Sequence, residues 1–526
     1  MNTNPMQPTT RKPLYNKTRS VALYLMISAL QGTGYMEGAT AKEQAGPSPS
    51  NSVIPAPTFY VDATGGSDAN DGLTVASAWQ TLEKVNSECV SPGSTVLFKR
   101  GEVWRGQLKP RGGTAQRSTL YGAWGTGTKP TILGSVNRKK PGDWIQGIGH
   151  WSDRDGVRYQ WRNGGPLWRC TTPFDVDIGN LIFNGGTSVG FKKWSQRELT
   201  AQGDYYYSYA KKQLIIYSTV NPGLFYNDIE VALKLHLVDL RGGQSFVTCE
   251  NLAIKYGAAH GFACSGNAPI TIRNCDVSFM GGGDQMMNGA NIRFGNGIEF
   301  WGNAHDCLVE KCRIWEIYDT ALTDQTAGDG VSQNNITYRN NVMWNCAYAS
   351  FECWCDGAVS TTMRNIRFEN NTCVGAGEGW GKPPQRPYAA GYQVDLAHDP
   401  YSKTAENLSG IYIRNNIFYQ YTQGLWVQQN PQWDAALTLA NNFWSQAGGN
   451  LKPVGPARAI FLFSSYESTN GKGAADPLFV NIGAQDFHLQ AGSPCVDAGL
   501  DAGIIDDCDS AARPAGHGFD IGAYER

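Results

Sequence analysis

The sequence predicts an all-β fold, a single parallel β-helix, and three observations lead to this prediction. Glycine supplies 62 of the 526 residues, more than the usual share of about 7%. Charged residues make up 17% of the chain and aromatic residues 11%, which excludes a disordered chain and a bundle of helices. The third observation, a repeat of short strand-like segments, is the most specific.

The repeat occupies the middle of the chain, and each of its units contains a short segment of alternating apolar residues. Alternation over four residues is the period of a β-strand. The segments are ITIR at 270–273, CLVE at 307–310, ITYR at 336–339, IRFE at 366–369, IYIR at 411–414 and LTLA at 437–440. A unit of this size cannot bury its own apolar face, so neighbouring units must stack into a solenoid.

A motif such as NNVM or NNTC follows each alternating segment, and one of its positions recurs every 24 to 45 residues. The shortest spacing fits one turn of a three-faced parallel β-helix, and longer spacings indicate loops inserted at the corners. This position holds Asn251, Cys275, Cys312, Asn341, Asn371, Asn416 and Asn442. Stacked Asn side chains can hydrogen-bond along a solenoid axis, so we expect an asparagine ladder here.

A second strand series runs in phase with the first, and alternate residues of each strand are expected to point outward. The inward positions are apolar except for Asp324. The first outward column holds Ala263, Glu299, Thr323, Glu352, Gln393 and Trp426, and the second holds Ser265, Trp301, Gln325, Trp354, Asp395 and Gln428. Carboxylates and Trp side chains thus share one predicted face.

The chain resembles the right-handed parallel β-helix proteins of the pectate-lyase-like superfamily. The resemblance rests on the repeats, on FYVDATGGSDANDGL at 59–73 with AWQTL at 78–82, and on DPLFV, DFHLQAGSPCVDAG and DIGAYE near the C-terminus. It implies one right-handed solenoid with an N-terminal cap and an irregular C-terminal segment, which is also the usual hand of parallel crossovers. The superfamily includes lyases, hydrolases, epimerases, esterases and non-enzymatic adhesins, so the resemblance implies no single activity.

The N-terminus has the three parts of an export signal: a basic stretch, the apolar run at 21–30 and a small-residue site at 39–41. We therefore expect a signal peptide at 1–41, a Pro/Ser-rich linker at 42–57 and the β-helix at 58–526, in a secreted or periplasmic protein. The apolar run is shorter than the ~20 residues of a membrane span. Thirteen cysteines are consistent with export, and Cys495 with Cys508 is the favoured disulfide.

The outward carboxylates are the candidate catalytic residues. Rungs of a parallel sheet lie ~4.8 Å apart, which predicts ~9.6 Å between the backbones of Glu299 and Glu352 and ~8 Å between Glu352 and Asp395. Inverting glycosidases hold their two carboxyl groups ~6.5–9.5 Å apart. Asp324 has two interpretations: a bulge turns it outward beside this pair, or it is buried and hydrogen-bonded.

Trp301, Trp354 and Trp426 are candidate platforms for sugar rings, since an indole face packs against the apolar face of a pyranose. Gln325 and Gln393 lie in the same columns and are candidate substrate contacts. Two insertions, at 281–296 and 375–391, are expected to wall a cleft. They bring further polar and aromatic side chains near the carboxylates, namely Asp284, Arg293, Glu378, Trp380, Lys382 and Arg386.

Three functions fit these residues. The first is an exported enzyme that hydrolyses a glycosidic bond with paired carboxylates. The second is a polysaccharide lyase, with His260, His398 or Lys382 as base and Arg386 or Ca²⁺ as the cation that stabilises the enolate-like charge. The third is a non-catalytic glycan-binding or matrix protein. In each case the partner is a polysaccharide.

The sequence gives few indications of a cofactor or of a further partner. No metal-ligand spacing is present, no cofactor is required, and Ca²⁺ enters only with the lyase hypothesis. A formal net charge of −2 gives no indication of nucleic-acid binding.

Overall fold

The structure, a computed structural model, describes residues 56–526 except for a set of short gaps. The gaps are 89, 148–150, 153–157, 160–164, 287–291, 327, 356–359, 388–389, 399–407, 428–430 and 446–475. The predicted signal peptide at 1–41 and residues 42–55 of the predicted linker lie outside the described residues. Among the described residues, no helix has the length and apolar character needed to cross a membrane.

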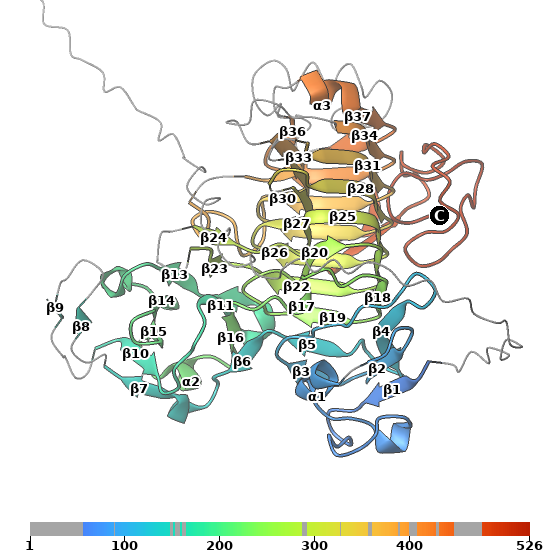
Figure 1. Ribbon diagram of the computed structural model, residues 1–526. Helices are drawn as coiled ribbons and strands as arrows, with labels where there is room; N and C mark the ends of the chain where they lie inside the picture. Colours follow the sequence, from blue (N-terminus) through green and yellow to red (C-terminus); the bar gives the residue numbers. More distant parts are fainter. Residues whose placement is uncertain are drawn as a thin grey trace, which may run out of the picture. The chain divides into compact units, whose positions relative to one another are not determined.

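The described chain is a right-handed parallel β-helix with three faces, as predicted (Figure 1). Face 1 consists of β1 (Thr58–Val61), β2 (Thr95–Lys99), β4 (Thr119–Trp124), β18 (Val247–Glu250), β21 (Ile270–Arg273), β25 (Ile298–Glu310), β28 (Ser332–Arg339), β31 (Thr362–Glu369), β34 (Leu408–Arg414) and β37 (Leu437–Ala440). Neighbouring strands of this face pair in parallel. Strand β25 turns the corner, so its first four residues belong to face 2.

Faces 2 and 3 complete each turn of the solenoid. Face 2 consists of β17 (Val238–Leu240), β20 (Phe262–Asn267), the start of β25, β27 (Thr320–Gln325), β30 (Ala349–Cys355), β33 (Tyr392–His398) and β36 (Gly424–Val427). Face 3 consists of β3 (Val103–Arg105), β5 (Thr131–Leu133), β19 (Ala253–Lys255), β22 (Asp276–Met280), β26 (Arg313–Ile317), β29 (Val342–Cys346), β32 (Thr372–Ala376), β35 (Ile417–Tyr421) and β38 (Phe443–Ser445). The chain visits the faces in the order 1, 3, 2.

The interior of the solenoid is a continuous apolar core filled by the inward residues of all three faces. Aromatic rings stack along it: Phe351 lies 4.4 Å from Phe368, and Phe418 lies 4.1 Å from Trp444, between ring centroids. Each fully buried side chain of this size contributes about 1.5–3 kcal/mol from the hydrophobic effect. The stacking of rungs is therefore what makes the individually unstable repeats stable.

The predicted asparagine ladder is present at the corner between faces 1 and 3. The backbone N–H of Asn341 donates to Asn371 Oδ1 at 3.0 Å, that of Asn371 to Asn416 Oδ1 at 2.9 Å, and that of Asn416 to Asn442 Oδ1 at 3.0 Å. All four side chains are buried. The expectation for Asn251 was wrong by one residue, because Leu252 occupies the buried position there.

The first Asn of each NN pair has a different role from the second. Asn340, Asn370 and Asn415 adopt left-handed backbone conformations, with φ of 55°, 52° and 55°. Asn tolerates this region better than most residues, which explains its recurrence at this turn. The side chains of these three residues point outward and hold the C-terminal segment, as in Asn415 Nδ2 to Leu500 O at 2.7 Å.

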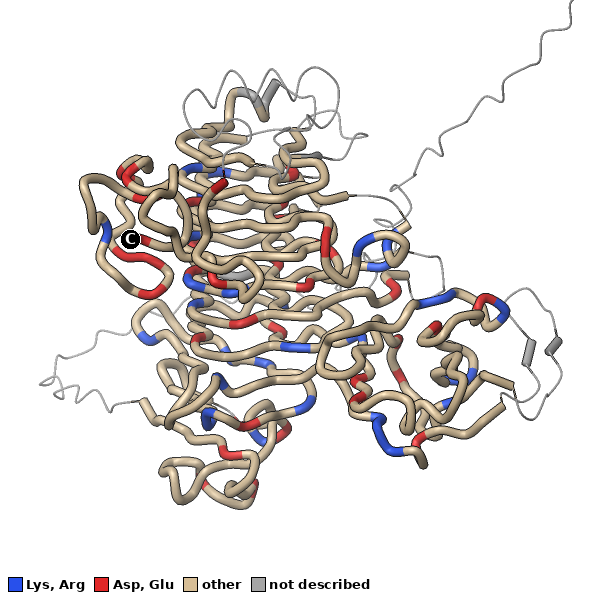
Figure 2. Tube along the Cα trace, turned by 180° about the vertical axis from the view of Figure 1, so that it is seen from behind, with Lys and Arg blue, Asp and Glu red and all other residues tan. Residues whose placement is uncertain are grey.

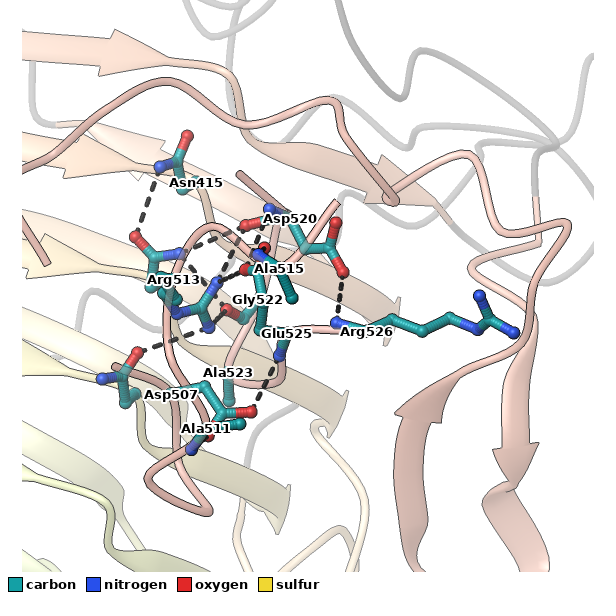
Figure 3. Close-up of polar contacts among 12 residues, drawn as sticks. Asn415, Asp507, Ala511, Arg513, Ala515, Asp520, Gly522, Ala523, Glu525 and Arg526 are labelled. Atoms are coloured by element: carbon teal, nitrogen blue, oxygen red, sulfur yellow. Dashed lines mark hydrogen bonds and ion pairs between the residues drawn. The ribbon is translucent and has the colours of Figure 1, made fainter. Parts of the chain in front are cut away.

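The C-terminal segment, residues 476–526, packs on the outer surface of face 3. It contains β39 (Phe479–Asn481) and β40 (Asp486–Leu489). Arg513 and Glu525 form a fully buried ion pair at 2.6 Å, and Arg513 also donates to Gly522 O at 2.8 Å (Figure 3). Cys495 and Cys508 are separate thiols, so the expected disulfide between them was wrong.

A module between residues 135 and 233, antiparallel except for the parallel pair β13 (Phe191–Lys193) and β14 (Asp204–Ser208) and called here the antiparallel module, interrupts the solenoid, and the sequence did not predict it. One sheet contains β6 (Ser135–Asn137), β11 (Ile178–Phe183), β12 (Ser188–Val189) and β16 (Ile229–Leu233). The other contains β7 (Trp144–Gln146), β10 (Leu167–Cys170), β13 (Phe191–Lys193), β14 (Asp204–Ser208) and β15 (Gln213–Tyr217). The two sheets enclose a separate apolar core.

The remaining α-helices and two-stranded hairpins of the described chain are short. The N-terminal cap contains α1 (Leu82–Ser87), whose first turn is closed by Thr81 Oγ1 accepting from the Lys84 N–H at 3.1 Å. The other elements are α2 (Pro222–Phe225), α3 (Pro431–Ala436), β8 (Trp151–Ser152), β9 (Arg158–Tyr159), β23 (Gly283–Asp284) and β24 (Arg293–Phe294). Acidic and basic residues are interspersed along the chain (Figure 2), in keeping with the small net charge.

Candidate functional site

A column of carboxylates follows the outer side of face 2. Glu299 pairs with Thr323, Thr323 with Glu352, and Glu352 with Asp395, each on the adjacent rung. Glu299 and Glu352 are thus two rungs apart, as predicted, which is ~9.6 Å between backbones. Asp395 was expected two positions further along the strand. It lies directly beside Glu352 instead, ~4.8 Å away.

Gln393, expected to pair with Glu352, was assigned to the wrong register. It lies beside Ser350, whose hydroxyl is 2.7 Å from Gln393 Oε1, and it is fully buried. Its amide group donates to the carbonyl of Cys373 on face 3 at 3.4 Å. Gln393 therefore ties the corner between two faces together and does not present its side chain at the outer surface.

Glu299 is held at the corner between the 281–296 loop and face 2. Asn296 Nδ2 donates to Glu299 Oε2 at 2.5 Å, and His260 Nε2 lies 3.2 Å from Glu299 Oε1. The backbone N–H of Asn296 donates to His260 Nδ1 at 3.0 Å. His236 stacks on His260, with ring centroids 4.8 Å apart. All of these groups except His236 are buried.

Burial shifts the titration of this group. It raises the pKa of Glu299 to about 8; the hydrogen bond from Asn296 acts in the opposite direction, and the charge of Glu352 adds to the rise. Burial also holds the pKa of His260 well below its ordinary value and lowers that of His236 to about 4. At neutral pH the structure therefore combines a protonated carboxyl with two neutral imidazoles.

Glu352 lies at the centre of the column and accepts hydrogen bonds from two neighbours on β27. Thr323 Oγ1 donates to Glu352 Oε2 at 2.9 Å, and Gln325 Nε2 donates to the same oxygen at 2.8 Å. Gln325 also contacts Thr323 Oγ1 at 3.1 Å. Gln325, predicted as a substrate contact, is a partner of Glu352.

Asp395 is buried at the next rung and accepts from Tyr348, with Tyr348 Oη 2.6 Å from Asp395 Oδ2. The guanidinium of Arg386 lies over the Tyr348 ring at 5.0 Å and donates to Asp319 Oδ1 at 2.6 Å. Arg386 is itself almost fully buried. The predicted substrate contact of Arg386 is thus replaced by an ion pair that fixes the turn before β27.

Three Trp side chains lie beside the carboxylates, as predicted. Trp301 and Trp354 stand two rungs apart with their rings nearly parallel, at an interplanar angle of 11° and a centroid distance of 6.5 Å. Trp301 is 41% exposed. Trp426 pairs with Asp395 on the last rung of the face and packs near Tyr392, 6.2 Å between centroids. Trp301 and Trp354 form an aromatic ridge along the solenoid axis, and Trp426 lies at the end of the carboxylate column.

Asp324 points into the core, so the buried interpretation is confirmed and the bulge is not. Its side chain is fully buried, and Tyr338 from face 1 donates to Asp324 Oδ1 at 2.7 Å. Burial raises the pKa of Asp324 to about 7, against the effect of the Tyr338 hydrogen bond. Asp324 cannot reach a substrate on the outer face and is removed from the candidate catalytic residues.

Most of the loop residues that were expected to line the cleft bind other parts of the protein instead. Trp380 is buried and donates from Nε1 to Glu316 O at 2.8 Å. Lys382 is half exposed and pairs with Glu378 at 2.6 Å. Asp284 and Arg293 are buried beside the antiparallel module, where they bond to its main chain and side chains. The side chain of His398 lies outside the described residues.

Several residues of the site were missed by the sequence reasoning. Asn296 binds three rungs at once, since its Oδ1 also accepts from the Thr320 N–H at 3.0 Å. Its setting between two glycines at a loop end was the available signal. Thr323 was in the predicted column without a role, and Tyr348 was not considered. Among the described residues, no cluster of three or more His, Cys, Asp or Glu side chains is placed to hold a metal ion.

No protein-family model and no curated protein matches the chain. Fourteen chains among the solved structures do. One is titled "Glycoside hydrolase", at 12% identity and a TM-score of 0.43 over 74% of this chain and 96% of that one. Another is the pectate lyase Pel9A, at 11% identity and 0.43 over 90% and 98%. A third is XylC in complex with xylose, at 12% and 0.40 over 89% and 99%. These likenesses are to the parallel β-helix fold alone.

Proposed function

We propose that the protein is a carbohydrate-active enzyme that hydrolyses a glycosidic bond at the outer side of face 2. The observation that carries the proposal is the pairing of two unlike carboxyl groups in one column. Glu299 is buried with a pKa raised to about 8, and Glu352 two rungs away is held by two hydrogen-bond donors. Two carboxyl groups in unlike surroundings within one column are typical of an acid and a base acting together.

In this mechanism Glu299 gives its proton to the glycosidic oxygen as the bond to the anomeric carbon breaks. Glu352 takes a proton from the attacking water, whose oxygen forms the new bond to that carbon. Backbones ~9.6 Å apart allow the two side chains to place their carboxyl groups within the ~6.5–9.5 Å that admits a water in inverting glycosidases. Asp395, directly beside Glu352 on the next rung, is a further carboxyl group of this column.

The aromatic ridge supplies the binding energy. A sugar ring packed on Trp354 lies on the strand that carries Glu352, two residues along, and Trp301 offers a parallel surface two rungs away. Stacking of this kind fixes the ring without demanding a particular hydroxyl pattern. Positioning by the ridge would bring the glycosidic oxygen between the two carboxyl groups.

The lyase alternative is less well supported by the described residues. β-Elimination needs a base with a lone pair and a cation to neutralise a uronate. The lone pair of neutral His260 already accepts the Asn296 N–H. The cations near the face have carboxylate partners: Arg241 binds Asp239 at 2.8 Å, and Arg386 and Lys382 are paired as described above. An uncharged glycan therefore suits this face better than a uronate.

A purely glycan-binding function is the second alternative, and the state of Glu299 argues against it. Binding by stacking and hydrogen bonds requires exposed polar groups but no buried carboxyl kept neutral at physiological pH. Groups with strongly shifted pKa values cluster at catalytic sites. The Trp residues alone are compatible with either function.

A product-resolved screen over neutral and acidic polysaccharides tests the proposal. The expected result is release of reducing ends from a neutral polysaccharide without the ultraviolet absorbance of an unsaturated uronate. An unsaturated product would establish the lyase instead. Binding to a glycan that is recovered intact after long incubation would establish the non-catalytic alternative.

We also propose that the protein is exported, and the support for this is the signal-like composition of residues 1–41. Expression of the full chain followed by N-terminal sequencing of the purified protein tests it. Cleavage after the small-residue site at 39–41 is expected. An intact N-terminus on protein retained in the cytoplasm would contradict export.

A further inference from the structure

Asn296 and His260 together surround the carboxyl group of Glu299, and their hydrogen bonds have a definite direction. Asn296 Oδ1 accepts the Thr320 N–H at 3.0 Å, which fixes the orientation of the amide and leaves Nδ2 to donate to Glu299 Oε2. A carbonyl oxygen cannot donate, so the assignment of the two amide atoms follows from the backbone contact. Asn296 is therefore a donor to Glu299.

The tautomer of His260 is fixed in the same way. Its Nδ1 accepts the backbone N–H of Asn296 at 3.0 Å. A neutral imidazole carries a single proton, which must then be on Nε2, and Nε2 is the atom that faces Glu299 Oε1 at 3.2 Å. His260 is also a donor to Glu299 and has no lone pair with which to take a proton from it.

The consequence concerns the proton on Glu299. Asn296 Nδ2 donates to one carboxyl oxygen, and the protonated Nε2 of His260 faces the other at 3.2 Å; neither of these groups can accept a proton from Glu299. We propose that Asn296 and His260 are positioning residues that direct the proton of Glu299 away from the protein and toward the substrate. This inference rests on the proposed function, in which Glu299 is already the acid, and adds to it two positioning residues.

The other titratable groups that face Glu299 or its partner His260 come from four segments of the chain. Glu352 on β30 and Asp319 before β27 favour its protonated form, and Arg241 after β17 favours the ionised form. His236, stacked behind His260, is neutral near physiological pH. Loss of activity on the alkaline side should therefore follow ionisation of Glu299, near pH 8.

Two substitutions at one position separate positioning from packing. His260→Gln can keep a donor near the place of Nε2, whereas His260→Asn can keep the acceptor for the Asn296 N–H and loses the donor to Glu299. Removing a donor from a carboxylate raises its pKa. We expect His260→Asn to move the alkaline limb of kcat/KM upward by about one pH unit and to lower kcat about tenfold, with little change in KM. His260→Gln should retain the wild-type limb.

The pKa of Glu299 can also be measured directly, by a titration that does not depend on enzyme activity. Protein labelled with ¹³C at the glutamate carboxyl groups is titrated by NMR, and the Glu299 signal is assigned from its absence in Glu299→Gln. Its midpoint should move upward in His260→Asn and in Asn296→Ala, and remain in place in His260→Gln. An unmoved midpoint in both His260→Asn and Asn296→Ala, or equal movement in the two His260 variants, overturns the inference. Moved midpoints without hydrolysis by any variant would contradict the proposed function and leave the hydrogen-bond assignment standing.

Discussion

Faces 2 and 3 of the solenoid bury outward side chains by different means. On face 3 the outward residues are largely apolar, and the C-terminal segment covers them with its own apolar side chains. Trp344 there is 8% exposed and packs 5.6 Å from Phe487. On face 2 the outward residues Glu299 and Glu352 are each 7% exposed, and polar neighbours surround them.

The difference shows that burying an outward residue can have two effects in one fold: it can stabilise the fold or change the pKa of a side chain. Face 3 uses it for stability, because the covering segment removes apolar surface from water. Face 2 uses it to alter the acid strength of Glu299, because a carboxyl group away from water favours its neutral form. The Trp pairs follow the same division: Trp315 and Trp344 stack beneath the C-terminal segment, whereas Trp301 remains exposed.

The largest stability effect is expected where the C-terminal segment is fastened. Arg513→Met leaves Glu525 as a buried charge without its guanidinium partner, which should cost about 3–5 kcal/mol. Denaturant unfolding followed by Trp fluorescence measures this loss. The double variant Arg513→Met/Glu525→Gln should recover part of it, and hydrolysis by the folded single variant should be unchanged. Equal stability of wild type and single variant would contradict the role given to this pair.

The next effect depends on pH and concerns Asp324 in the core. Its pKa is about 7 when folded and near its ordinary value of 3.8 when unfolded, so its contribution is fully present below about pH 4. That contribution is lost as pH rises through 7, by up to about 4 kcal/mol. Asp324→Asn avoids the loss and should be more stable than wild type at pH 8 and similar at pH 4. A stability difference that is the same at both pH values would show that ionisation of Asp324 is not the cause.

The smallest effects are expected from substitutions that compare a Trp of face 2 with a Trp of face 3. Trp354→Ala should raise KM about five- to tenfold through lost stacking of about 1 kcal/mol, with little change in melting temperature. Trp344→Ala is the matched control on face 3, and it should lower stability by about 3 kcal/mol without changing KM. Melting curves and kinetics on the same preparations test both. A reversed outcome would place the binding surface on face 3.

The sequence predicted the solenoid because its signals are local and repeated. Alternating segments return turn after turn and NN pairs follow four of them, and an error such as that at Asn251 affects one residue only. The antiparallel module at 135–233 breaks the repeat and offers no period from which to infer its sheets. Its position in the chain was therefore not recognised.

The candidate site was predicted only in part, for reasons of register and tertiary contact. In YQVDL, apolar Tyr392 and Val394 are two residues apart, so a slip of two residues preserves the alternation and leaves the pairing of Asp395 undetermined. The burial of Asp324 against Tyr338 and the use of Arg386 at Asp319 depend on contacts across the solenoid or from a distant loop. The alternation of apolar and polar residues within one strand gives no information about these contacts.

The activity of Glu352→Gln decides whether face 2 carries a catalytic carboxylate. The substitution removes the charge and keeps an oxygen for the donors Thr323 and Gln325, so the fold should be retained with an unchanged melting temperature. On whichever polysaccharide the wild type hydrolyses, we expect kcat to fall about 10²- to 10⁴-fold. Full activity of Glu352→Gln would contradict a catalytic carboxylate at this position and with it the proposed site on face 2.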